Sequence, residues 1–409
     1  MKSVKKNKLY ELDATPQNIT DKTLQEYTSI NELIIGNNPN ITNDGIKHLN
    51  CDKLTLKNNK NITNIKHMDK LIHLSIIGDC VITNDDIKQL NCWWITLYNN
   101  KNITNLDHMN KLRNLDIFGD CSMTDDDIKN LNCVTRLNLV NNTRITKINH
   151  MNLEQLRCDN SVLTNESLEG LRLDNLYIGA QKYITKIPPI YSTYWTNIEN
   201  KMIEKSYKGF DELDLSGNTI LDNDSIKDID ACELRISDCP NITDISHMKN
   251  VHHLTAQGKC GLDFASIKEL TIYWLDIHGN VNIKYISDLV TIQHLRYSGD
   301  FISDEEIDKL KLNIWLNRYC DIKHHQLDMI KFPDNANKNN DEVFCGILES
   351  LSDDLLNCLE NNLEKNNNIY KISYSKQLNI HKNVLLKYIY GIEIQNMKRL
   401  ISPVVYKLR

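Results

Sequence analysis

Four histidines recur at one position of a repeated phrase, and they are the first residues whose chemistry could matter. His67, His108 and His150 each precede a methionine in closely related phrases, and His247 takes the same position in a later one. Imidazole nitrogens bind zinc at about 2.1 Å, so two ligands of one ion must lie close together. Successive phrases lie two repeat units apart, or about 10 Å at the usual spacing of paired strands. We therefore expect a ladder of structural histidines, with no metal site and no cofactor.

Two acidic runs, at 83–86 and 124–127, could suggest a calcium site. An EF-hand loop requires a glycine at its sixth position and a glutamate at its twelfth, and neither run provides them. Acidic side chains in the first turn of a helix explain both runs, because they complement the positive end of the helix dipole. The sequence also contains no P-loop, G-x-S-x-G, H-E-x-x-H or C-x-x-C motif. We predict no catalytic residue, and hence a protein that is not an enzyme.

Aromatic and arginine side chains gather at strand positions that would point away from the core. Trp, Tyr and Arg are the residue types enriched at the energetic centres of protein interfaces. One group on four successive units is predicted to carry the main partner site: Trp94, Tyr98, Phe118, Arg136 and Arg157. Further partner contacts are predicted along the same face: Tyr177, Trp274, Arg296 and Trp315. The alternative is that these rings pack on neighbouring strands and only cover the sheet.

These positions are set by a short pattern of an apolar residue, any residue and a second apolar residue, which returns every 19 to 22 residues apart from one longer step. Its first position falls at Leu12, Leu33, Leu54, Leu74, Ile95, Leu115, Leu137, Leu156, Leu176, Leu213, Leu234, Leu254, Leu275, Leu295 and Ile314. Five residues later an asparagine often follows: Asn38, Asn59, Asn100, Asn142, Asn218 and Asn280, with Cys239 in the same position. The alternation predicts short strands, and the asparagine is expected to satisfy backbone groups in the turn that follows.

This pattern resembles the leucine-rich repeat, L-x-x-L-x-L-x-x-N/C-x-L, over residues 9–322. One unit cannot bury its own apolar side chains, so neighbouring units must stack and pair their strands in parallel. We predict an α/β repeat fold: a curved leucine-rich-repeat solenoid with its parallel sheet on the concave face. A small, mainly helical domain is expected at the C-terminus.

Long and short units alternate, since Cys51, Cys92 and Cys133 stand 41 residues apart in matching phrases. These cysteines are expected to be buried and reduced. In each long unit a threonine precedes acidic residues and is a predicted helix N-cap: Thr42, Thr83 and Thr124. The long units also resemble the cysteine-containing repeats of F-box leucine-rich proteins. That resemblance implies an alternative function, a substrate adaptor for a ubiquitin ligase.

One step of 37 residues contains an insertion near 188–207, which begins with Pro188 and Pro189. A proline pair stops a helix or a strand. Insertions in solenoids become loops on one face, often the binding face. The insertion therefore has two interpretations, a binding loop that carries Tyr194 and Trp195 or filler on the convex side.

Beyond the repeats the sequence changes character. We assign residues 1–322 to the solenoid with its insertion, 323–340 to a polar linker, and 341–409 to a C-terminal helical or capping domain. The stretch 351–359 loosely resembles the opening of the F-box-like module of poxviral ankyrin-repeat proteins, which implies a ligase-recruiting role. The segment 364–409 has nine Lys and Arg against two Asp and Glu. Because these positive charges are spread along the segment and not clustered, we do not expect it to bind nucleic acid.

The bulk composition argues against some classes of partner and location. The net charge of −6 across 409 residues does not favour a nucleic-acid partner. No signal peptide and no run of about 18 apolar residues is present, so a cytoplasmic protein with free thiols at its twelve cysteines is expected. The chain is similar to the repeat-protein families of large AT-rich DNA viruses, such as insect poxviruses and giant amoebal viruses. That similarity implies a host protein as partner and host cytoplasm as location. We predict a non-enzymatic scaffold that binds a protein on its concave face.

Overall fold

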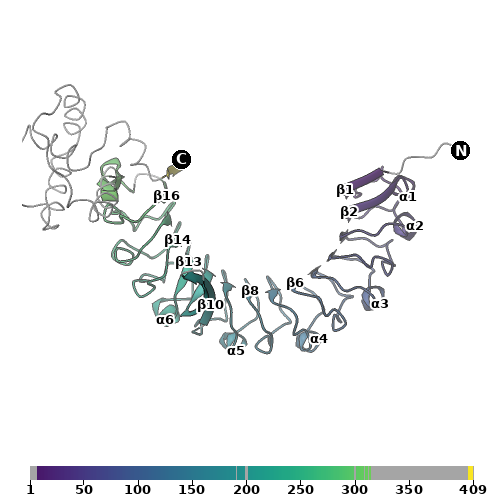
Figure 1. Cartoon of the computed structure of the whole chain (residues 1–409), viewed down its shortest axis with the longest axis horizontal. Helices are drawn as coiled ribbons and strands as arrows, with labels where there is room; N and C mark the ends of the chain where they lie inside the picture. Colours follow the sequence, from purple (N-terminus) through teal and green to yellow (C-terminus); the bar gives the residue numbers. More distant parts are fainter. Residues whose placement is uncertain are drawn as a thin grey trace, which may run out of the picture. The chain divides into compact units, whose positions relative to one another are not determined.

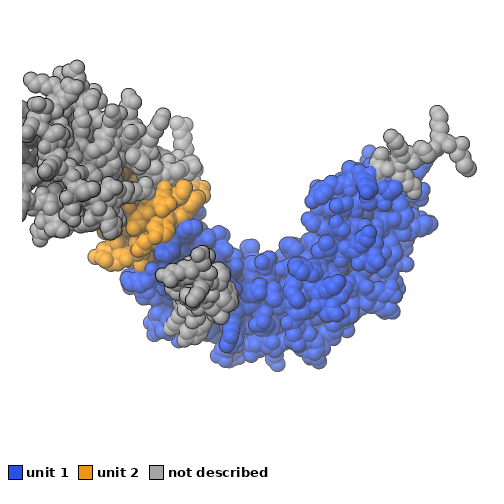
Figure 2. All heavy atoms as spheres, viewed as in Figure 1, with its two compact units in different colours: residues 1–262 blue, residues 263–409 orange. Residues whose placement is uncertain are grey.

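The computed structural model describes residues 7–189, 191–198, 201–298, 301–307, 309–311, 313–314 and 404–408. The chain divides into two compact units, residues 1–262 (unit 1) and residues 263–409 (unit 2), which are coloured separately in Figure 2. None of the helices in the described part of the chain is long and apolar enough to cross a bilayer.

Unit 1 is a stack of coils, each contributing one strand to a single parallel sheet in chain order (Figure 1). Its strands are β1 (Asn7–Asp13), β2 (Tyr27–Ile35), β3 (Lys53–Lys57), β4 (His73–Ile77), β5 (Trp94–Tyr98), β6 (Asn114–Phe118), β7 (Arg136–Asn138), β8 (Gln155–Arg157), β9 (Asn175–Tyr177), β12 (Phe210–Asp214), β13 (Ala231–Arg235) and β14 (His253–Thr255). The predicted parallel-sheet solenoid is confirmed for this unit.

The strand register in unit 1 is the one that the apolar pattern predicts. Leu33 pairs with Leu54, Leu54 with Leu74, and Leu74 with Ile95, and the correspondence continues strand by strand to Leu254. From Leu33 onward each of these side chains in unit 1 is at most 1% exposed. Burying one leucine contributes about 1.5–3 kcal/mol relative to leaving it in water. The stacked apolar rows therefore fix which residues face outward.

One-turn helices close coils of unit 1 on the side opposite the sheet (Figure 1). The helices are α1 (Asp21–Leu24), α2 (Asn43–Ile46), α3 (Asn84–Ile87), α4 (Asp125–Ile128), α5 (Asn165–Leu168) and α6 (Asn223–Ile226). Helices α1 and α2 close the first two coils, and from α2 onward every second coil has a helix. The predicted N-caps Thr42, Thr83 and Thr124 are confirmed. The alternation of long and short units is confirmed with them.

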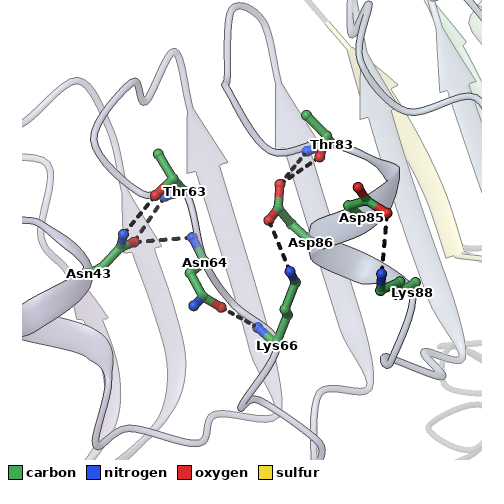
Figure 3. Close-up of polar contacts among 8 residues, drawn as sticks. All are labelled: Asn43, Thr63, Asn64, Lys66, Thr83, Asp85, Asp86 and Lys88. Atoms are coloured by element: carbon green, nitrogen blue, oxygen red, sulfur yellow. Dashed lines mark hydrogen bonds and ion pairs between the residues drawn. The ribbon is translucent and has the colours of Figure 1, made fainter.

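Side chains at the helix starts tie each long coil to the short coil that follows, as Figure 3 shows for α2. The Asn43 side chain accepts hydrogen bonds from the backbone N–H groups of Thr63 at 2.9 Å and Asn64 at 3.1 Å. At the next helix, Asp86 accepts from both the backbone and the hydroxyl of Thr83, at 2.9 and 2.7 Å. The acidic residues of the first run therefore cap and brace this helix turn, as expected.

The predicted asparagine role is also confirmed. Buried Asn59 accepts through Oδ1 from the backbone N–H groups of Asn61 at 3.1 Å and Ile62 at 2.8 Å. Asn100 makes the same two contacts one double repeat later. Each asparagine thereby satisfies backbone donors in the turn after its strand.

The cysteine ladder holds at two of its three positions. Cys51 and Cys92 are fully buried free thiols, and burial raises the pKa of each to about 12. Cys133 is free but only half-buried, so its predicted burial is wrong. One extra residue separates Cys133 from the next strand, and Val134 takes the inward position instead, with no exposed area.

The insertion forms an antiparallel hairpin of β10 (Tyr191–Ile198) and β11 (Lys201–Lys208). Its predicted loop is therefore replaced by regular strands. The main sheet continues across it, because β12 pairs directly with β9. The hairpin is an addition to the sheet and leaves the repeat register unchanged.

Unit 2 contains a parallel pair, β15 (Trp274–Asp276) and β16 (His294–Ser298), and β16 also pairs in parallel with β17 (Val404–Leu408). The strand predicted at Ile314 is wrong, because that residue is helical and buried. Ile307 and Leu310 are buried as well, and the steps of three residues from Ile307 to Leu310 and of four from Leu310 to Ile314 match a helical period. The predicted linker 323–340 and most of the predicted domain 341–409 lie outside the described residues.

Candidate interaction surface

Exposed apolar side chains gather on the outward side of β4, β5 and β6. Trp94 is 41% exposed and Tyr98 is 46% exposed, and both extend from β5. Trp93 and Ile72, just before β5 and β4, are 55% and 53% exposed. Phe118, at the end of β6, is half-buried. We call Trp94, Tyr98, Phe118, His73 and Asp116 the aromatic surface.

The rings of the aromatic surface pack along the stacking direction of the coils. His73 and Trp94 are register partners, and their rings stack with centroids 4.6 Å apart and planes 15° apart. Tyr98 and Phe118 are also partners, with centroids 6.3 Å apart and tilted planes. Ring packing on neighbouring strands is thus present, yet Trp94 and Tyr98 keep more than two-fifths of their area in solvent. Their side chains are pre-positioned and still accessible.

A carboxylate lies among these rings. Asp116 Oδ2 accepts hydrogen bonds from Trp94 Nε1 at 2.7 Å and from the Thr96 hydroxyl at 2.9 Å. Burial raises the pKa of Asp116, and these two hydrogen bonds oppose the rise. No Lys, Arg or His of the described chain forms an ion pair with it. The aromatic surface therefore carries a partly desolvated negative charge.

The two predicted arginines lie on the next two coils. Arg136, in β7, is exposed, shares a register row with Trp94 and Asn114, and makes no ion pair with any described residue. Arg157, in β8, is exposed and pairs with Asp159 at 2.8 Å. The structure thus places the five residues of the predicted main site on four successive strands, as the sequence register requires.

Tyr177 belongs to a different kind of surface, over β9, β12 and β13. Its hydroxyl donates to Glu212 at 2.6 Å, and Arg235 bridges Glu212 at 3.1 Å and Glu233 at 2.6 Å. Burial, followed by the bond to Glu212, raises the pKa of Tyr177. We call Tyr177, Glu212, Glu233 and Arg235 the paired surface, because its polar groups satisfy one another.

The remaining predicted contacts fall in unit 2. Trp274 and His294 are register partners with ring centroids 4.9 Å apart. Arg296 is half-buried and pairs at 3.1 Å with Asp276, which is almost fully buried. Trp315 lies outside the described residues.

Sequence reasoning missed His73 and Asp116. Asp116 stands between the buried residues Leu115 and Ile117, so the alternating pattern itself marks it as outward-facing. Its acidic type is uncommon at interface centres, and a search for Trp, Tyr and Arg overlooks it. His73 could have been found from its register with Trp94.

The histidine ladder has a structural role, as predicted. The ring Nε2 atoms of His67 and His108 lie 3.0 Å from the carbonyl oxygens of Ile46 and Ile87, the last residues of α2 and α3. His150 and His247 make the same contact with α4 and α6. Each histidine can cap a helix C-terminus of the preceding coil, where carbonyl groups lack partners within the helix.

No protein-family model matches the sequence, and no curated protein matches it either. The chain is similar to the solved functional domain of InlJ from Listeria monocytogenes, which is described as including a cysteine ladder. The two are 19% identical with a TM-score of 0.39, over 69% of this chain and 62% of that domain. The LRR protein LIC12759 of Leptospira interrogans is 17% identical with a TM-score of 0.40, over 74% of this chain and 91% of that one. The internalin inlF of Listeria monocytogenes is 17% identical with a TM-score of 0.34, over 72% and 80% of the two chains. These are distant likenesses of repeat proteins and identify no ligand.

Proposed function

We propose that this protein is a non-enzymatic scaffold that binds a protein partner on the aromatic surface of its solenoid sheet. The observation that carries the proposal is the exposure of Trp94 and Tyr98 on one strand, held in place by His73 and Phe118 on the strands beside it. Such rings supply a large contact area, and little side-chain entropy is lost when a partner covers them.

The placement of this surface also favours binding. Its rings stand on a sheet whose other face is the fully buried core, so the backbone beneath them is rigid. Arg136, two strands beyond Trp94 and without an ion pair in the described chain, offers a guanidinium at the rim of the surface. We further propose a cytoplasmic location, and a host protein as the partner if the chain is viral.

The test compares partner capture by three purified proteins in extract of the native cell. Trp94→Ala combined with Arg136→Ala removes a ring and a charge from the proposed surface. Tyr183→Ala combined with Arg144→Ala removes the same types of group from exposed turns outside the strands. Truncating interface centres commonly costs about 2 kcal/mol or more, or tens-fold in affinity. The first variant should lose its partner while its melting temperature barely changes, and the control should keep it. If both variants retain the partner as well as the parent does, the binding site lies elsewhere.

The adaptor function is the alternative proposal, and it rests on the sequence resemblances of the long units and of 351–359. Both functions need the same target-binding surface. Only the adaptor predicts a second, independent partner. Recovery of a cullin-type ligase subunit by the parent protein and equally by the Trp94→Ala, Arg136→Ala variant would favour the adaptor. Loss of every partner in that variant would favour the plain scaffold.

A further inference from the structure

Asp116 is the acidic member of the aromatic surface, and one of its two carboxylate oxygens has no hydrogen bond from the described chain. Both of its hydrogen bonds, from Trp94 and Thr96, arrive at Oδ2. No described residue donates a hydrogen bond to Oδ1. This oxygen is not fully buried, so solvent reaches it. Burial already disfavours the charged carboxylate, and a charge held this way gains most from a cation that brings its own hydrogen bonds.

Unit 2 contains a similar arrangement in which the cation is present. Asp276 occupies the same position of its strand as Asp116, between two buried residues, and Arg296 of the next strand pairs with it at 3.1 Å. Beside this pair, Trp274 lies against His294. The order of strands differs, since Trp274 shares β15 with Asp276 and His294 shares β16 with Arg296, whereas His73, Trp94 and Asp116 come from three successive strands. The chain therefore builds a tryptophan, a histidine and an aspartate together with an arginine in one place.

At Asp116 the matching arginine is missing. The register partner of Asp116 on the next strand is Asn138, where Arg296 stands opposite Asp276. The nearest arginine further along that row, Arg157, is already paired with Asp159. Arg136 lies in the neighbouring row and forms no ion pair with Asp116. Among the described residues, therefore, none supplies a cation to this carboxylate, which leaves it open to a cation from another molecule.

The side chains beside Asp116 favour one kind of cation as its partner. His73 covers one face of the Trp94 ring, and on the opposite side the register row continues with the short side chain of Asn114. A planar guanidinium can stack on an indole with its face and at the same time donate to Oδ1 with its edge, whereas an ammonium has no planar face to stack. Charge, shape and hydrogen-bonding capacity thus agree on arginine.

We propose that the partner inserts an arginine side chain that stacks on Trp94 and donates to Asp116, supplying the guanidinium that Arg296 supplies to Asp276. The inference rests on the proposed function, since it assigns the chemistry of the partner at the same surface. The occupant is an arginine-bearing segment of a protein, and the aromatic rings around it bind its apolar neighbours.

The test uses benzoyl-arginine amide as the probe, with benzoyl-citrulline amide and benzoyl-lysine amide as matched comparisons. The indole N–H signals of the full chain, labelled with ¹⁵N-tryptophan, are followed by NMR, and Trp94→Phe identifies the Trp94 signal. The arginine compound should shift this signal saturably, and at least about tenfold more tightly than the citrulline compound, which keeps the shape and loses the charge. The lysine compound should bind more weakly than the arginine compound.

Two variants separate charge from folding. Asp116→Asn keeps oxygen and shape, so Trp94 and Thr96 retain an acceptor, and it should abolish the preference for arginine over citrulline. Asp126→Asn removes an equal charge from an exposed first-turn position on α4 and should leave the preference intact.

Equal binding of arginine and citrulline, or an unchanged preference in Asp116→Asn, would overturn the proposal. If the probe binds as expected but no protein partner depends on Trp94, the proposed function fails while the guanidinium site stands. If partner capture depends on Trp94 and is unaffected by Asp116→Asn, the arginine inference alone fails.

Discussion

The aromatic surface and the paired surface occupy the same sheet of unit 1 and differ in what each strand finds on its neighbour. Over β9, β12 and β13, Tyr177, Glu212 and Arg235 bond to one another across the strands. Over β5 and β6, Trp94 is 41% exposed and Asp116 has no cation among the described residues. The backbone register is equally regular in both places. The difference therefore lies in side-chain complementarity between adjacent coils.

This contrast shows how a repeat scaffold can acquire a binding site without changing its fold. A coil that places a complementary group opposite its neighbour closes its own surface, as Arg235 does beside Glu212. A coil that omits the complement, as Asn138 does beside Asp116, leaves bonding capacity for another molecule. The core beneath is fully buried in either case, so selection at outward positions has little effect on stability.

The largest expected effect comes from closing the aromatic surface. Asn138→Arg would place a guanidinium opposite Asp116, at the register position that Arg296 holds relative to Asp276. Since an internal cation would then occupy the carboxylate, partner affinity should fall about tenfold or more, and stability should rise by at most about 1 kcal/mol. Titration calorimetry and urea unfolding measure the two quantities. Asn138→Gln is the control for side-chain size, and tight binding by the arginine variant would contradict the comparison.

Removing the shared cation of the paired surface should have a smaller effect, and only stability should change. Arg235→Ala leaves Glu212 and Glu233 without their shared cation. Because the arginine side chain is 42% exposed, solvent screening limits the loss to about 1 kcal/mol. Urea unfolding should show this loss, whereas the affinity for the partner should not change. A marked fall in affinity would show that the paired surface also binds.

The smallest effect is a change in how stability depends on pH. The folded-state pKa of Asp116 is raised, chiefly by burial. The folded state therefore holds this proton more tightly than the unfolded chain, and ionisation destabilises it as pH rises through the carboxyl range. The free energy of unfolding of Asp116→Asn, relative to that of the parent, should therefore increase between about pH 4 and pH 7.

Asp125→Asn provides the opposite sign as a control. Burial acts to raise the pKa of Asp125, but hydrogen bonds from Thr146 and Lys147 outweigh it and lower the pKa. Its contribution to stability is present above the unfolded-state pKa and is lost as pH falls. The parent should therefore gain on Asp125→Asn as pH rises in the acid range. Parallel pH profiles for the two variants would contradict the assigned environments.

The strand register could be predicted from the sequence because it follows from local alternation. Every apolar position assigned between Leu33 and Leu254 pairs as expected, since a slip by one residue would turn each core side chain outward. The failures also have local causes. Ile314 belongs to a helical period that competes with the strand pattern, and the extra residue after Cys133 moves Val134 into the core.

The site was less predictable because it depends on pairs of residues about 20 positions apart. The sequence register located Trp94, Tyr98 and Arg136 on one face, but it did not distinguish an exposed ring from a paired one. Tyr177 and Tyr98 are the same residue type in different register rows, and the hydrogen bond from Tyr177 to Glu212, on the next strand, could not be foreseen from the sequence. That information comes from how neighbouring coils meet and from side-chain conformation.

Oxidative footprinting of the free and partner-bound protein tests the central claim most directly, because it maps the covered rings without any substitution. Hydroxyl radicals modify exposed aromatic side chains, and mass spectrometry reports the rate at each one. Partner binding should slow oxidation of Trp94 and Tyr98 several-fold and leave Tyr10 and Tyr183, which are also exposed, at their free rates. Unchanged oxidation of Trp94 and Tyr98, with protection at Tyr10, Tyr183 or the hairpin 191–208 instead, would contradict the account.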